Sequence, residues 1–366
     1  MGTMRFVLAM AVVAFHLLAI PKIGPIAVQA FFVLSGFLMT LVMHTSYDYS
    51  PSGFGRFWLN RILRLYPIYI VSLLLTLPLA LIFGPARDHA IDNALGVPMT
   101  LAGWVQNATL IFYNLDTPRL SPPAWALTTE LFYYLVISLG FSATRLRTWA
   151  LFAAGAAYMA WGIAIGRDFY ALYFSIWSGA LPFGAGALLW HYREDLSRLL
   201  TGLAGNARWT RALIGAGSAG ILATVGGRAL ASLLDLGPAA EAVMLPLTVV
   251  PAAALVLGCT RLKLTGFARR ADRVLGDLSY PVYVSHFFFG MVAEGLTGLY
   301  APRHDMLTLE TFVITCVLMF AGCYLMTRLI DEPIQRMREK VRGAPGPVDV
   351  EAAEAGKPEG VAAFNR

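Results

Sequence analysis

The chain has 366 residues, of which 57% are hydrophobic and only 14% are charged, and its mean hydropathy is positive. These values exclude an ordinary soluble domain and a disordered chain, and they predict a polytopic membrane protein. The net charge of +6 does not indicate nucleic-acid binding, because the basic residues stand in short clusters between apolar runs, as in the loops of membrane proteins.

Ten apolar runs have the length of roughly 17 to 25 residues that a membrane-spanning helix needs. In chain order they cover residues 4–20, 26–44, 62–83, 120–140, 148–166, 169–190, 211–227, 240–259, 279–299 and 307–330. Residues 84–119 contain three prolines and a semi-apolar middle, which predicts a re-entrant or interfacial segment. We therefore expect an all-α polytopic integral membrane protein with about ten transmembrane helices.

The distribution of Lys and Arg predicts which loops face the cytoplasm, because cytoplasmic loops hold most basic residues. With both termini cytoplasmic, 22 of the 28 basic residues fall on the inner side. The other six are Lys22, Arg87, Arg119, Arg167, Arg228 and Arg303. We expect a membrane domain over residues 1–340 and a disordered cytoplasmic tail over residues 341–366, since the tail lacks apolar periodicity.

The first apolar run, "MRFVLAMAVVAFHLL", carries Arg5 near its start and His16 deep within it. Ionisable groups inside a membrane span are costly and indicate function by default. The two residues share a helix face and are separated by about 16 Å along the axis. A neutral imidazole can accept a proton near neutral pH, which favours a catalytic role for His16. The alternatives are a membrane anchor for Arg5 and a packing role for His16.

Two further stretches carry polar groups into the predicted membrane domain. In "VQAFFVLSGFLM", Ser35 and Gly36 interrupt an apolar span, and small residues there usually indicate helix packing. In "RFWLNRILRLYPIY", Arg61 and Arg64 stand at i and i+3 and project from one helix face at the inner membrane surface. Their guanidinium groups can bind the phosphates of a ligand, or they can anchor the helix to lipid phosphates.

Glu130, in "LSPPAWALTTELFYYL", lies near mid-membrane with no Lys or Arg in the same span. A carboxylate there must be protonated, paired or in a water-filled cavity. Glu130 and His16 are predicted at similar depth, so one hypothesis is a His–Glu couple in which the carboxylate fixes the imidazole tautomer. Two later stretches, "LGDLSYPVYVSHF" with His286 and "IDEPIQRMR" with Glu332, are weak indications taken singly.

The three cysteines predict neither a disulfide framework nor a zinc site. Cys259, Cys316 and Cys323 lie in or beside apolar runs and lack metal-ligand spacing. The first apolar run ends without a small-residue cleavage pattern, so we expect a retained span and not a signal peptide.

Taken in order, the stretches above resemble membrane-bound acyltransferase family 3, which includes O-antigen, exopolysaccharide and peptidoglycan O-acyltransferases. The resemblance covers residues 4–336 and rests on R-x10-H, "FFVLSGF", "NRILRLYP", "AWALTTELFYYL", "LSYPVYVSH" and "DEP". It implies O-acyl transfer across the membrane, with an acyl group, commonly acetyl, that arrives on cytoplasmic coenzyme A and leaves on a glycan hydroxyl outside. In that family the first-span Arg and His are regarded as essential.

Carried over residue by residue, the resemblance implies that Arg5 and His16 are essential and that Arg61 and Arg64 form the family's R-x-x-R pair. Together with the reading of Glu130, we expect His16, Glu130 and Arg5 to be catalytic and the R-x-x-R pair to bind the coenzyme. The expected donor is acyl-CoA, with no metal, in the bacterial inner (cytoplasmic) membrane.

The expected partners are membrane lipid and a carbohydrate or glycolipid acceptor, reached directly or through a separate extracytoplasmic partner. The alternative is a proton-coupled polytopic transporter, in which His16 and Glu130 relay protons and the arginines form a substrate gate.

Overall fold

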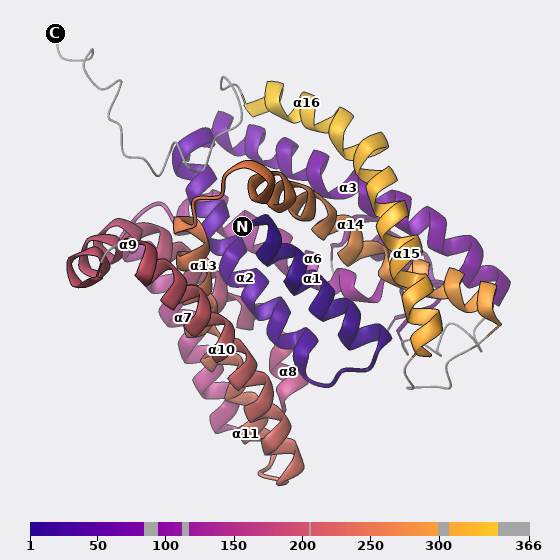
Figure 1. The fold of residues 1–366 in the computed structure, drawn as a ribbon, viewed down its shortest axis with the longest axis horizontal. Coiled ribbons are helices and arrows are strands. Elements are labelled where there is room, and N and C mark those ends of the chain that lie inside the picture. The colour runs from indigo at the N-terminus through magenta and orange to yellow at the C-terminus, as the bar shows by residue number, and fades with distance from the viewer. Residues whose placement is uncertain (84–93, 112–116, 205, 299–306, 343–366) are drawn as a thin grey trace.

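The computed structural model describes residues 1–83, 94–111, 117–204, 206–298 and 307–342, and over these residues the chain is helical (Figure 1). The described part contains no strand, only an isolated bridge between Leu95 and Arg119. The last helix ends at Arg342, so the predicted disordered tail, apart from its first two residues, lies outside the described residues.

Helical segments overlap each of the ten predicted spans. They are α1 (Gly2–Leu17), α2 (Ile23–Val42), η1 (Met43–Tyr47), α3 (Pro51–Phe83), α5 (Leu101–Thr109), η2 (Pro122–Ala124), α6 (Trp125–Val136), η3 (Ile137–Phe141), α7 (Arg145–Ala164), α8 (Phe169–Tyr173), η4 (Ile176–Gly179), α9 (Ala180–Ala204), α10 (Asn206–Leu233), α11 (Pro238–Ala242), α12 (Met244–Leu247), α13 (Val249–Arg261), α14 (Gly266–Thr297), α15 (Leu309–Met326), η5 (Thr327–Asp331) and α16 (Glu332–Arg342).

Within the described residues, six helical stretches are long and apolar enough to cross a membrane. They are Ile23–Tyr47, Pro51–Ile82, Pro122–Phe141, Ala207–Leu233, Pro238–Arg261 and Leu309–Arg342. These stretches confirm that the protein is a multi-pass membrane protein. The total of ten spans and the cytoplasmic placement of both termini stay predictions.

One predicted span, residues 169–190, is not a single helix. α8 ends at Tyr173, the backbone is extended at Ser175, and α9 begins only after the turn η4. The Ser175 hydroxyl lies 2.7 Å from the hydroxyl of Tyr158, to which Arg167 also donates a hydrogen bond. Hydropathy averages over a window of residues, so it does not show a break that these polar contacts stabilise.

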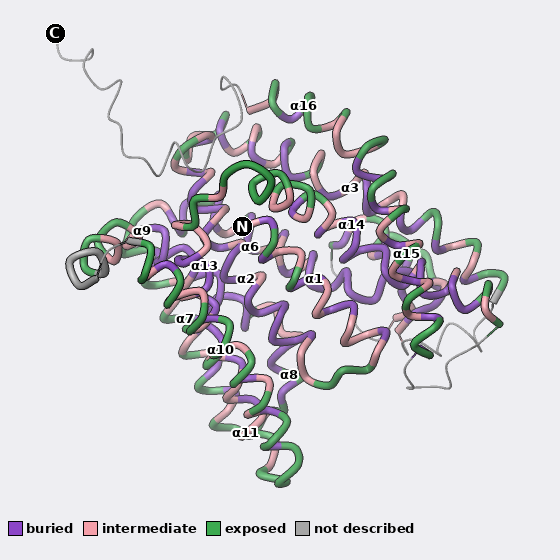
Figure 2. The backbone as a smooth tube through the Cα atoms, in the orientation of Figure 1, coloured by how far each residue is buried: buried purple, intermediate pink, exposed green. Residues whose placement is uncertain are grey.

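The centre of the bundle is formed by α1, α2 and α14. Helix α1 packs against both α2 and α14, α2 packs against α9 on another side, and α15 covers α14 (Figure 1). Figure 2 shows α2 almost wholly buried, whereas α10 and α15 expose much of their length. Their exposed side chains include Leu222 and Val317, and large apolar groups of this kind suit a helix face in contact with lipid.

Gly36 and Gly186 allow the backbones of α2 and α9 to approach closely. A Cβ atom added at Gly36 would lie 2.2 Å from the carbonyl oxygen of Phe183, and one at Gly186 would lie 2.0 Å from that of Val33. Real Cβ atoms essentially never come this close to another heavy atom. The small residue predicted to serve packing at position 36 therefore does so, and it holds α2 in the position from which Ser35 meets α6.

The segment before α6 enters the bundle from the side. The Tyr69 hydroxyl donates to the Asn107 carbonyl at 2.6 Å, and the Tyr66 hydroxyl donates to that of Thr109. The Asn107 side chain in turn accepts a hydrogen bond from the backbone of Leu120. Both tyrosines lie near the middle of α3, so these contacts favour the re-entrant alternative for this part of the chain.

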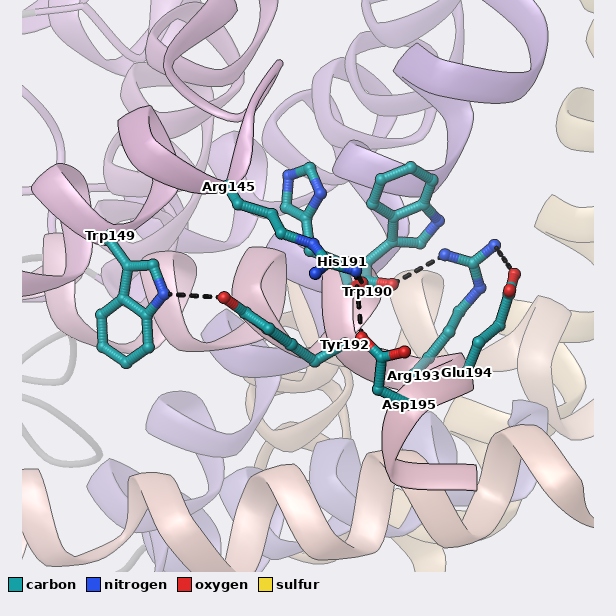
Figure 3. Close-up of polar contacts among 8 residues, drawn as sticks. All are labelled: Arg145, Trp149, Trp190, His191, Tyr192, Arg193, Glu194 and Asp195. Carbon is teal, nitrogen blue, oxygen red and sulfur yellow. Dashed lines mark hydrogen bonds and ion pairs between the residues drawn. The ribbon is translucent and has the colours of Figure 1, made fainter. Parts of the chain in front are cut away.

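A polar and aromatic cluster joins α7 to α9 at the predicted cytoplasmic side (Figure 3). Its members are Arg145, Trp149, Trp190, His191, Tyr192, Arg193, Glu194 and Asp195. Arg145 bonds the His191 carbonyl and the Asp195 carboxylate, and Trp149 donates to the Tyr192 hydroxyl at 3.1 Å. Because Arg145 and Asp195 are about half exposed, their ion pair contributes little, and the cluster serves mainly to align the two helices.

We expect Gly36→Ala to destabilise the protein, because the added methyl group would force α2 and α9 apart at a cost of about 1–3 kcal/mol. Gly215→Ala in α10 is the matched control, since nothing lies within 4 Å of the added atom and alanine favours the helix. Thermal unfolding in detergent should show a lower midpoint for the first variant only. Equal midpoints for both variants would contradict the close approach.

Candidate functional site

A cavity of about 240 Å³ lies among α1, α2, α3, α6, α14 and α16. Seven of its lining residues come from one face of α2: Val28, Phe31, Phe32, Ser35, Leu38, Met39 and Val42. The cavity therefore follows α2 from residue 28 to residue 42, a length of about 21 Å. This is roughly two thirds of the thickness of a bilayer's hydrocarbon core. The small volume over that length makes the cavity narrow.

Arginines dominate the charge of this cavity. Its lining includes Arg5, Arg61, Arg64, Arg338 and Arg342, which come from α1, α3 and α16. One acidic side chain, Glu130, is also in the lining, which leaves a surplus of four formal positive charges. Buried positive charge without equivalent negative charge favours an anionic ligand, and guanidinium groups suit phosphate especially well.

The predicted pair Arg61 and Arg64 is confirmed to face one cavity, but its surroundings come from a distant part of the chain. Asn60 Oδ1 accepts hydrogen bonds from Arg61 at 3.1 Å and from Arg338 at 3.3 Å. Asn60 Nδ2 donates to the Arg338 carbonyl at 3.1 Å, and Asp331 lies 3.9 Å from the Arg338 guanidinium. Asn60 thus holds α16 against α3 and brings the arginines of both helices together.

Arg5 is placed by a contact between α1 and α14. Helix α1 has no capping side chain of its own, and the Asp272 carboxylate of α14 accepts hydrogen bonds from the backbone of Gly2 at 3.0 Å and of Thr3 at 2.7 Å. Burial alone would raise the pKa of Asp272, but the hydrogen bonds from Thr3 and Gly2 lower it to about 2. The carboxylate therefore stays ionised and fixes the start of α1, one turn before Arg5.

Glu130 is held inside the cavity by two hydroxyl groups. Its carboxylate accepts a hydrogen bond from Ser35 of α2 at 2.7 Å and another from Tyr134, one turn later on α6. The hypothetical His16–Glu130 couple is not formed, since His16 Nδ1 instead lies 3.0 Å from Nε2 of His286. Similar depth did not bring the two groups together, because α1 faces α14 whereas α6 faces α2.

His16 and His286 form a pair between α1 and α14. Their rings are nearly parallel, with centroids 5.2 Å apart, and Phe287 lies against the His16 ring. Tyr283, one turn before His286, lines the cavity, so the pair lies just beyond the end of the cavity that Val28 lines. Leu95 of the entering segment packs on Phe287 and covers this region.

The sequence gave little indication of several of these residues. His286 was a weak indication by itself, and its importance follows only from the contact with His16. Arg338 and Arg342 stand in a strongly charged stretch near the predicted tail, which resembles any solvated cytoplasmic segment. Their place in the cavity depends on the packing of α16 against α3, which no local pattern encodes.

Comparison with known proteins gives matches along nearly the whole chain. The family model described as an acyltransferase domain matches residues 2–328. The exopolysaccharide production protein ExoZ of Rhizobium meliloti is 26% identical over 340 residues, which are 86% of this chain and 90% of the relative.

Two other relatives match over shorter regions. The peptidoglycan O-acetyltransferase OatA of Listeria monocytogenes is 31% identical over 141 residues, which are 36% of this chain and 22% of the relative. The acyltransferase MdmB of Streptomyces mycarofaciens is 26% identical over 134 residues, 35% of this chain and 31% of the relative. The matched region thus spans less than a third of each of these two relatives. No solved structure matches the chain.

We expect Glu130→Ala to destabilise the protein more than Glu130→Gln. Alanine leaves the hydroxyls of Ser35 and Tyr134 without their acceptor, at about 1–3 kcal/mol for each buried group. Glutamine keeps a carbonyl oxygen in the same place. Thermal unfolding of both variants in detergent measures the difference, and an equally large loss in Glu130→Gln would show that the negative charge, and not the acceptor, is what stabilises the site.

Proposed function

The chain belongs to membrane-bound acyltransferase family 3 and is therefore an acyltransferase, and we propose that it moves an acyl group from cytoplasmic acyl-CoA to a hydroxyl of an extracytoplasmic glycan or lipid-linked sugar. The observation that carries this proposal is the narrow arginine-lined cavity, which follows α2 and reaches the histidine pair. We place the protein in the bacterial inner membrane, with the arginine-rich end of the cavity toward the cytoplasm.

The donor site is the cavity itself. Coenzyme A carries a diphosphate and a further phosphate at one end and a thioester at the end of a thin, flexible arm. The five arginines suit the phosphates, while Phe31, Leu38 and Leu65 offer an apolar wall along which the arm can extend. Arg5 belongs to this donor-binding group, because it lies about 16 Å from His16 and is too far away to act on the thioester.

The acyl group would be transferred at His16. Its imidazole removes the proton from the acceptor hydroxyl, and the oxygen attacks the carbonyl carbon of the thioester. The carbon–sulfur bond then breaks, and the departing sulfur receives the proton from the imidazolium, which returns His16 to its neutral form. A second route passes through an acyl-histidine, in which the imidazole nitrogen attacks first and the acceptor hydroxyl afterwards takes the acyl group from it.

The remaining predicted residue, Glu130, has a positioning role in this proposal. Its contacts with Ser35 and Tyr134 join α2 to α6 across the donor cavity, so it supports the shape of the cavity and does not act on His16. The transporter alternative required a proton relay between His16 and Glu130, and their different partners remove the support for it.

Carbohydrate is the acceptor class that the relatives favour. One relative is named for exopolysaccharide production and another for O-acetylation of peptidoglycan. Both names point to hydroxyl groups on glycans outside the cytoplasm, and His16 is predicted toward that side of the membrane. Acetyl is the acyl group that the name of the second relative supports.

We expect Arg64→Ala to weaken the binding of acetyl-CoA about 10- to 100-fold, because a lost hydrogen bond to a charged group is worth about 1.5–3 kcal/mol. Arg270→Ala is the matched control, since it removes a positive charge from an exposed position of α14 that does not line the cavity. Calorimetric titration of acetyl-CoA and of free coenzyme A into the purified protein measures both variants. No binding by folded wild-type protein would refute the proposed donor.

We expect His16→Ala to reduce acyl transfer at least about 100-fold while acetyl-CoA still binds with wild-type affinity, because the base is lost and the arginines remain. The assay follows labelled acetyl from acetyl-CoA into the polysaccharide fraction of membranes that contain the protein. His191→Ala is the control, because this histidine bonds the Ser142 carbonyl away from the cavity. Retained transfer in His16→Ala would exclude both proposed routes.

A further inference from the structure

The histidine pair is built into the register of two helices. Asp272 meets Gly2 at the start of α1, and fourteen residues later on both helices His286 meets His16. Helices α1 and α14 therefore run parallel with matched residues at two points about 21 Å apart. Two heptads separate these points, as expected where one helix face stays in contact with its neighbour. The contact between the imidazoles is thus fixed by the helix packing and not by side-chain flexibility alone.

The hydrogen bonds of His286 decide which of its nitrogens carries a proton. Nδ1 of His286 lies 2.8 Å from the carbonyl oxygen of Tyr283, and a carbonyl oxygen can only accept a hydrogen bond. Nδ1 of a neutral His286 must therefore carry the proton, which leaves a lone pair on Nε2. The reverse tautomer would place two lone pairs against each other at this distance.

The same reasoning extends to His16. Nε2 of His286, with its lone pair, lies 3.0 Å from Nδ1 of His16, so Nδ1 of His16 must be the donor. A neutral imidazole has one proton, and Nε2 of His16 is consequently left unprotonated. This is the form in which a histidine can act as a base or as a nucleophile.

We propose that His286 is a positioning residue that holds His16 in the tautomer with a free Nε2 and accepts a hydrogen bond from the imidazolium formed during acyl transfer. This inference rests on the proposed function of His16. The chain of contacts runs from the Tyr283 carbonyl through His286 to His16, and it does for His16 what a carboxylate does for the histidine of a serine protease triad. His286 is fully buried, whereas His16 is only half-buried and keeps access for substrate.

Three variants of His286 test this role. The amide of His286→Gln can place an oxygen near the position of Nε2, where it accepts a hydrogen bond from His16. The shorter amide of His286→Asn reaches only the position of Nδ1 and serves as the matched control. We expect the turnover of His286→Ala and of His286→Asn to fall about 100-fold, and that of His286→Gln to recover at least a tenth of the wild-type rate. The KM for acetyl-CoA should stay unchanged in all three.

The tautomer of His16 is measured separately from activity. In protein labelled with nitrogen-15 histidine, protonated and unprotonated ring nitrogens give distinct resonances, and His16→Gln identifies those of His16. We expect an unprotonated Nε2 in wild-type protein and a mixture of tautomers in His286→Ala.

The outcomes separate the two proposals. A protonated Nε2 in the wild type, or turnover in His286→Gln no higher than in His286→Asn, would overturn the positioning role. A free Nε2 in a protein that transfers no acyl group would instead refute the proposed function.

Discussion

The parallel contact between α1 and α14 is the constraint on which the candidate site depends. It is fixed at one end by a carboxylate that caps α1 and at the other end by a hydrogen bond between two imidazoles. The first contact positions Arg5 at the donor end of the cavity, and the second positions His16 at the other. Since a helix is stiff over about 21 Å, fixing its two ends also fixes the distance between phosphate binding and chemistry.

The positive charge of the cavity has a structural consequence. Arg61 and Arg338 are almost fully buried, and charges removed from water are tolerated only where hydrogen bonds or opposite charges compensate them. Asn60 supplies such hydrogen bonds to both guanidinium groups, but a surplus of positive charge persists around the cavity. An anionic ligand would relieve this surplus, so the feature that strains the empty site is also what favours binding of a phosphate-bearing donor.

Local sequence patterns predicted the elements well and their partners less well. Helices lie at each of the ten apolar runs, and the i, i+3 spacing of Arg61 and Arg64 correctly predicted that both face one site. The break at Ser175 was not predicted, because hydropathy does not detect a helix interrupted by hydrogen bonds from another segment. The His16–Glu130 couple was wrong as a contact, since predicted depth says nothing about which helix stands beside which.

The sequence by itself determined that this is a multi-pass helical membrane protein, because apolar length and the positions of basic residues respond directly to the bilayer. It also determined the family, through motifs in a fixed order along the chain. Only the tertiary structure decided that His286 is the partner of His16, that Glu130 belongs to the donor cavity, and that α16 adds two arginines to it. These contacts join residues that are 95 to 278 positions apart, and they exist only once the helices have packed side by side.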